Sequence, residues 1–228
     1  MIADKTTFLK GTGLMASFIL VFVLIFMPLF NNRNGLEYLD DLYNSISKGS
    51  AYYIPKLKEK TAVFQSQQVT LQLTFKSQTM ASQAAKLMEE SGARVEITGD
   101  TLKVSGDLGR ILDNCLEDAD LMYLNQGDRV RDKYGYDQRR VLFNWWETAG
   151  LMDKALKRQK LFQEALTVVE VRKKGVETSY NYYGIEPQRI TAKWGVVTFS
   201  LIFYVVYTIW YGFAIMFLFE GYGLRLEH

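Results

Sequence analysis

Two long apolar runs without a single charge constrain this chain more than any other feature. One covers the 22 residues from Gly11 to Asn32, and the other covers the 26 residues from Trp194 to Phe219. About 20 consecutive apolar residues are enough for a helix to cross the hydrocarbon core of a bilayer. We therefore predict two transmembrane helices, over residues 12–31 and 194–219, and exclude a purely soluble globular protein.

The first run shares some features with a secretory signal peptide. Lys5 and Lys10 precede its apolar stretch, as in the charged beginning of such a peptide. However, the polar segment 31–34 follows the apolar stretch, where a cleavage site would need small residues. We therefore expect the first helix to remain as a membrane anchor that Pro28 kinks or ends.

The second run differs from the first because hydroxyl side chains recur along it at spacings of three and four residues. This spacing places them on one helical face, where lipid would leave the hydroxyl groups short of hydrogen-bond partners. Aromatic belts at the membrane surface do not reach the middle of a span, where two of the tyrosines fall. The pattern therefore favours a stripe that packs against protein, made of Ser200, Tyr204, Tyr207, Thr208 and Tyr211.

The distribution of basic residues bears on the orientation of the two helices. Lys5 and Lys10 precede the first helix and only Arg33 closely follows it, which favours a cytoplasmic N-terminus. The second helix shows the opposite bias, but the first helix usually dominates and long loops weaken the rule. We expect a two-pass protein of the plasma (inner) membrane, with cytoplasmic termini and a central domain outside.

The residues between the two runs predict a small α+β sandwich. Segment 69–75 alternates apolar and polar residues like a half-buried strand, and segment 77–91 then has helical spacing. A hairpin is expected around Gly99 and Asp100, followed by a helix that Asp107 caps and that ends near Gly127. This order is close to most of a ferredoxin-like unit, a fold that hosts many functions.

Helical periodicity flanks the sandwich on both sides. Segment 36–46 predicts a short amphipathic helix, and Pro55 lies in an expected loop. From Gln138 to about Tyr182, the apolar spacing indicates one long helix or a helical hairpin bent near Gly150. The expected fold is thus an α+β membrane protein with these parts: tail 1–11, transmembrane helix 12–31, juxtamembrane helix and loop 32–68, sandwich 69–127, long helical segment 128–193, transmembrane helix 194–219 and tail 220–228.

The composition excludes several kinds of site. Cys115 and His228 are the only cysteine and histidine, so this chain alone cannot form a disulfide, a Cys/His zinc site, an iron–sulfur cluster or a haem site with two His ligands. A Ser-His-acid or Cys-His catalytic arrangement is excluded for the same reason. We expect no catalytic residue, no cofactor and no metal. The ending Leu226-Glu227-His228 also resembles the start of a purification tag.

In the part of the chain that lies between the two apolar runs, charge is distributed unevenly. Segment 100–120 contains six acids against two bases, a net charge of −4, whereas segment 129–174 contains twelve bases against six acids, a net charge of +6. The bases are either a solvated helix face or a docking face for anionic lipid headgroups or an acidic partner. This basic face consists of Lys154, Lys157, Arg158 and Lys160.

Aromatic residues cluster on the long helical segment and just before the second run. Amphipathic rings prefer the headgroup region of a membrane, although protein interfaces and quinone sites use the same residues. We expect a membrane-interface position for Trp145, Trp146, Tyr180, Tyr182, Tyr183 and Trp194.

Together, the polar stripe, the missing cofactor ligands and the large helical segment favour a noncatalytic accessory or structural subunit of a multi-subunit membrane complex. The complex would serve respiratory electron transfer or transport. Expected partners are the lipid bilayer and other membrane subunits, among them carriers of haem or iron–sulfur groups, and no nucleic acid. The alternative is a stand-alone membrane-anchored binding or sensory domain.

Overall fold

The computed structural model describes residues 2–30 and 32–224, so His228 and the suggested tag lie outside the described residues. The described chain is mostly helical, with a small three-stranded antiparallel sheet. It forms two compact units. We call Met1–Gly49 with Pro187–His228 the hairpin unit, and Ser50–Glu186 the central unit.

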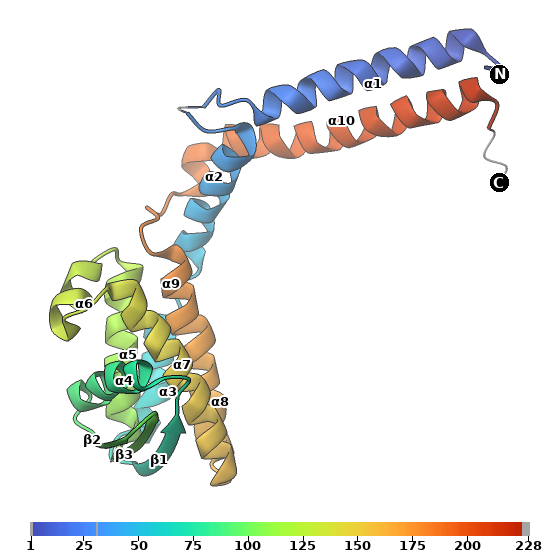
Figure 1. The fold of residues 1–228 in the computed structure, drawn as a ribbon. Helices are drawn as coiled ribbons and strands as arrows, with labels where there is room; N and C mark the ends of the chain where they lie inside the picture. Colours follow the sequence, from blue (N-terminus) through green and yellow to red (C-terminus); the bar gives the residue numbers. More distant parts are fainter. Residues whose placement is uncertain (1, 31, 225–228) are drawn as a thin grey trace. The chain divides into compact units, whose positions relative to one another are not determined.

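The hairpin unit contains α1 (Lys5–Phe26), α2 (Gly35–Ser50) and α10 (Ile190–Tyr222). Helices α1 and α10 lie side by side, and each is long and apolar enough to span a membrane (Figure 1). Helix α1 begins earlier than expected because the Asp4 carboxylate accepts hydrogen bonds from the first main-chain N–H groups. It ends at Phe26, so Pro28 lies outside it.

Glycines allow α1 and α10 to approach closely at two places. A Cβ atom on Gly11 would lie 2.6 Å from the main-chain nitrogen of Leu218. A Cβ atom on Gly221 would lie 2.6 Å from Cα of Phe8. Both separations are shorter than real Cβ atoms tolerate, so the close contact depends on the absence of a side chain at these positions.

The sheet of the central unit has the order β1-β3-β2, formed by Gln68–Thr74, Thr101–Asp107 and Arg94–Thr98. Both pairings are antiparallel, and Leu71 pairs with Val104, which pairs with Val95. Strand β1 buries Val69, Leu71 and Leu73 and exposes the residues between them, as its alternating sequence predicts. The buried face packs on helices (Figure 1).

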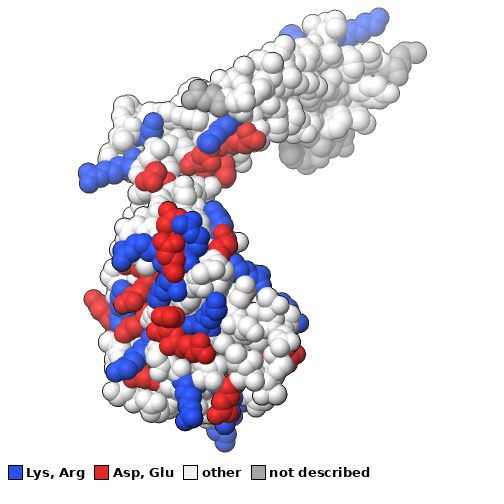
Figure 2. Space-filling model, turned by 60° about the vertical axis from the view of Figure 1, so that its left-hand side comes forward, with Lys and Arg blue, Asp and Glu red and all other residues white. Residues whose placement is uncertain are grey.

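The helices of the central unit share one apolar core with the sheet. Their bounds are α3 (Ile54–Thr61), the short 3₁₀ turn η1 (Ala62–Phe64), α4 (Gln78–Glu90), α5 (Leu108–Tyr123), α6 (Gly127–Tyr134), α7 (Gln138–Arg158), α8 (Phe162–Glu170), the π-helical turn η2 (Val171–Glu177) and α9 (Thr178–Tyr182). Figure 2 shows charged residues spread over this unit and few over α1 and α10.

Three local expectations are wrong. Pro55 does not lie in a loop but in the first turn of α3, where its missing N–H costs nothing. Gly127 does not end α5 but begins α6, because Asn125 already turns the chain with a positive φ of 59°. The helical hairpin does not bend near Gly150, since α7 continues to Arg158 and the chain reverses at Lys160, whose φ is 62°.

Candidate functional site

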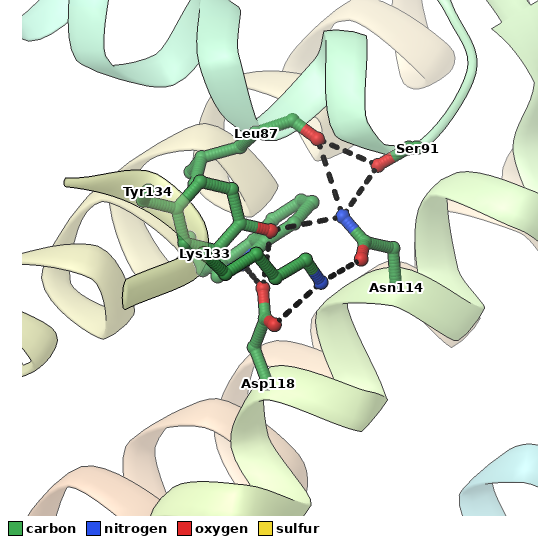
Figure 3. Close-up of polar contacts among 7 residues, drawn as sticks. Leu87, Ser91, Asn114, Asp118, Lys133 and Tyr134 are labelled. Atoms are coloured by element: carbon green, nitrogen blue, oxygen red, sulfur yellow. Dashed lines mark hydrogen bonds and ion pairs between the residues drawn. The ribbon is translucent and has the colours of Figure 1, made fainter. Parts of the chain in front are cut away.

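A buried cluster of polar side chains centred on Asp118 is the most unusual feature of the central unit (Figure 3). The Asp118 side chain is 0% exposed. Its carboxylate accepts three hydrogen bonds: from Nζ of Lys133 at 2.8 Å, from the hydroxyl of Tyr134 at 2.6 Å and from Nε1 of Trp145 at 2.8 Å. The ion pair and the two neutral donors together compensate the buried negative charge.

Asn114 extends the cluster toward α4. Its amide nitrogen donates to Oγ of Ser91 and to the hydroxyl of Tyr134, both at 3.0 Å, and its carbonyl oxygen accepts from Lys133. Ser91 in turn donates to the carbonyl of Leu87 at 2.7 Å. The cluster therefore connects α4, α5, α6 and α7 (Figure 3).

Local structure explains why these residues meet. Asn114 and Asp118 are four residues apart on α5, so their side chains lie on one face, one turn apart. Lys133 and Tyr134 occupy the last turn of α6, which ends at Gly135 in the left-handed conformation. The short α6 thus presents a cation and a phenol to the same face of α5.

Two groups in this region, Tyr134 and Cys115, have a raised pKa. Burial, and then the negative charge of Asp118, raise the pKa of Tyr134 above its ordinary value. Burial likewise raises the pKa of the Cys115 thiol. The phenol therefore remains protonated and able to donate to Asp118, and the thiol remains a poor nucleophile. Since Asp118 is fully covered by protein, the geometry supports a structural tether between helices and no contact with a substrate.

The residues of the predicted stripe on α10 divide between two environments. Ser200 lies 2.7 Å from the hydroxyl of Tyr43 on α2. The hydroxyl of Tyr207 donates to the carbonyl of Phe18 at 3.3 Å, and the two rings stack with centroids 4.2 Å apart. These two stripe residues thus contact other helices of their own hairpin unit.

The remaining stripe residues are more exposed, although the ring of Tyr211 still lies 5.1 Å from the ring of Phe18 on α1. Tyr204 is 70% exposed and Tyr211 is 45% exposed. Among the described residues, no group forms a hydrogen bond with either hydroxyl. Thr208 donates to the carbonyl of Tyr204 at 2.8 Å, within its own helix.

Tyr204 borders a large apolar groove within the hairpin unit. The groove has a volume of about 1290 Å³ and is lined by α1, α2, α10 and the segment after α1. Its walls include Phe22, Phe26, Leu36 and Phe203. It is wide enough for a lipid chain or the side chains of a neighbouring helix.

The expected membrane-interface residues differ in their surroundings. Trp145 is only 1% exposed and donates to Asp118, so the expectation is wrong for this residue. Trp146 is half-buried beneath the guanidinium of Arg172, whose Cζ atom lies 3.6 Å from the ring centroid. Tyr180, Tyr182 and Tyr183 are half-buried against the core of the central unit, while Trp194 on α10 is exposed.

The predicted basic face is exposed at the C-terminal end of α7 and the turn after it. Lys157 forms an ion pair with Asp153 at 2.9 Å. Among the described residues, Lys154, Arg158 and Lys160 have no acidic partner. Lys154, Lys157 and Arg158 line a groove of about 520 Å³ beside β1.

Sequence reasoning missed the cluster, although one signal for Asp118 was present. Asp118 falls at helical spacing between Cys115 and Met122 on the apolar stripe of α5, where a carboxylate needs a buried partner. The identity of that partner could not be inferred, because Lys133 belongs to another helix.

Comparisons of the chain with protein-family models, with curated proteins and with solved structures found no match.

Proposed function

We propose that this protein is a two-pass accessory subunit of a membrane complex, anchored by α1 and α10 and noncatalytic. The hairpin positions a partner-binding surface in the membrane, and the central unit is a rigid domain at the membrane surface. Its strand and helix order, β1-α4-β2-β3-α5, corresponds to most of a ferredoxin-like sandwich. The complex serves respiratory electron transfer or transport.

The exposed Tyr204 carries this proposal. It lies near the middle of α10, which extends from Ile190 to Tyr222, and would therefore sit deep in hydrocarbon. A phenol there favours a hydrogen-bond acceptor on a neighbouring helix, because lipid tails supply none. Since α1 engages Tyr207 but leaves Tyr204 uncovered, the acceptor belongs to another chain. The adjoining apolar groove gives that chain a surface to pack against.

We expect Tyr204→Phe to weaken the retention of copurifying membrane subunits about threefold, because a hydrogen bond between membrane helices contributes about 0.6 kcal/mol. Tyr204→Ala should have a larger effect, since it also removes the ring that packs on the partner. The measurement is quantitative mass spectrometry of chains that copurify with the protein from source membranes in mild detergent.

Val206→Ala is the matched control, because Val206 is also exposed but lies on the opposite side of α10. It should retain the subunits at the wild-type level. Equal retention by Tyr204→Ala and wild type would contradict the proposal. Recovery of a second copy of this chain as the sole partner would instead favour a stand-alone sensory or binding protein that dimerises.

For sidedness we propose cytoplasmic termini and an external central unit, in a plasma (inner) membrane. Cys115 is buried and so cannot report sidedness. In a Cys115→Ala background, Val63→Cys occupies a position that is 75% exposed, and a membrane-impermeant maleimide should label it in intact cells. Thr6→Cys should be labelled only after the membrane is opened. The reverse pattern would contradict the proposed orientation.

A further inference from the structure

The sheet of the central unit has an open edge along β1. Within the part of the chain that the structure describes, strand β1 pairs only with β3. At its two ends, Gln67 accepts a main-chain hydrogen bond from Leu108, and Phe75 donates one to Asp100, both at 2.9 Å. Hydrogen bonding alternates along antiparallel strands. The main-chain N–H and C=O groups of the odd-numbered residues of β1 therefore point toward β3. Those of the even-numbered residues point toward the open edge.

Only part of this edge is covered. The side chain of Gln159 donates to the carbonyl of Thr70 at 2.7 Å. Within residues 2–30 and 32–224, the main-chain groups of Gln72 and Thr74 have no hydrogen-bond partner. A row of unpaired main-chain donors and acceptors on an edge strand is a template for another strand.

The uncovered part of the edge borders a positively charged groove. The groove, about 520 Å³ in volume, is lined by Gln72 and Thr74 on one side and by residues of α7 on the other. Lys154 and Arg158 are four residues apart on α7, both are exposed, and neither has an acidic partner among the described residues. Lys157 adds a third base, partly neutralised by Asp153.

A purely local role explains only part of this arrangement. Bases in the last turn of a helix interact favourably with its dipole, which accounts for Lys157 and Arg158. It does not account for Lys154, which lies before the last turn, or for the unpaired edge beside it. The groove also suits a peptide better than a simple anion, because a strand edge offers both donors and acceptors, whereas a phosphate would use the donors alone.

We propose that an extended acidic polypeptide segment of another protein binds in this groove. Its main chain adds a strand to β1 at Gln72 and Thr74, and its carboxylates contact Lys154 and Arg158. The site is independent of the proposed function in the membrane, since it uses none of the residues of the hairpin unit.

The test uses the full-length protein in detergent and a capped seven-residue peptide of alternating Glu and Val, the length of β1. Binding should be saturable and weakened by salt. Hydrogen exchange of the Gln72 and Thr74 amides should slow about tenfold at saturation. The double variant Lys154→Glu with Arg158→Glu should weaken binding about tenfold. The control Arg94→Glu, which replaces an exposed base of β2, should not change binding.

A peptide of the same charge with alternate N-methylated amides separates strand pairing from charge attraction, and it should not bind. Binding by this peptide, or binding without protection of β1, would overturn the proposal in favour of ion pairing alone. Preference for phosphatidylglycerol nanodiscs over the peptide, again without protection of β1, would instead identify a lipid-binding face and equally overturn it. Unchanged protection of Cys115 from alkylation verifies that each variant is folded.

Discussion

Asp118→Ala is expected to destabilise the central unit by about 3–5 kcal/mol, the cost of removing one partner of a buried ion pair. The substitution leaves Lys133, Tyr134 and Trp145 without their common acceptor. Because these donors belong to α6 and α7, the packing of both helices on α5 should weaken together. Asp118→Asn should cost less, since an amide oxygen can still accept hydrogen bonds.

Cys115 provides a direct measurement of this loss. It is the only thiol in the chain and is buried one turn from Asp118, so it reacts with a maleimide only when the central unit opens. The rate of alkylation should rise strongly in Asp118→Ala. Asp128→Ala, which removes an ion pair to Arg131 that is exposed on both sides, should leave the rate near that of the wild type. Equal alkylation rates for both variants would contradict the role of Asp118 as a tether between helices.

The substitution Gly11→Leu or Gly221→Leu is expected to separate α1 from α10. At both positions a Cβ atom would overlap main-chain atoms of the facing helix, which cannot move aside as a flexible side chain can. Overpacking of this kind typically costs about 1–3 kcal/mol. The expected result is a longer and broader distance between spin labels at Leu9 and Phe219, two exposed positions, in a Cys115→Ala background.

Gly13→Leu and Gly212→Leu are the matched controls for this experiment. They lie on the same two helices, but a Cβ atom at either position meets no atom of the described residues within 4 Å. Both should therefore keep the wild-type distance. If all four variants give the same distribution, the close approach of the two helices is not determined by Gly11 and Gly221.

The features predicted from the sequence are those that depend on local periodicity. The two uncharged runs predict α1 and α10, and the alternation in 69–75 predicts β1. The ends of helices and strands were less predictable, because the same residue type can occur inside an element or outside it. Pro55 suits a loop or the first turn of a helix equally well, and Lys160 adopts the left-handed conformation that sequence reasoning assigns to glycine.

The Asp118 cluster could not be predicted, because its contacts join residues from different helices. Trp145 illustrates the difficulty. Its neighbour Trp146 and the surrounding charges are typical of a membrane surface, yet its ring is in the core and its N–H is bonded to Asp118. Similarly, only the packing of α1 distinguishes Tyr207, which it covers, from Tyr204, which it leaves exposed.

Photocrosslinking at position 204 tests the central claim, that another membrane subunit packs on α10, most directly. Benzoylphenylalanine in place of Tyr204, irradiated in native membranes, should give a covalent adduct heavier than the 26.3 kDa chain that contains a second, different polypeptide. The same group in place of Val206 should react with lipid. Lipid adducts alone at both positions would contradict the proposed role as a subunit of a complex.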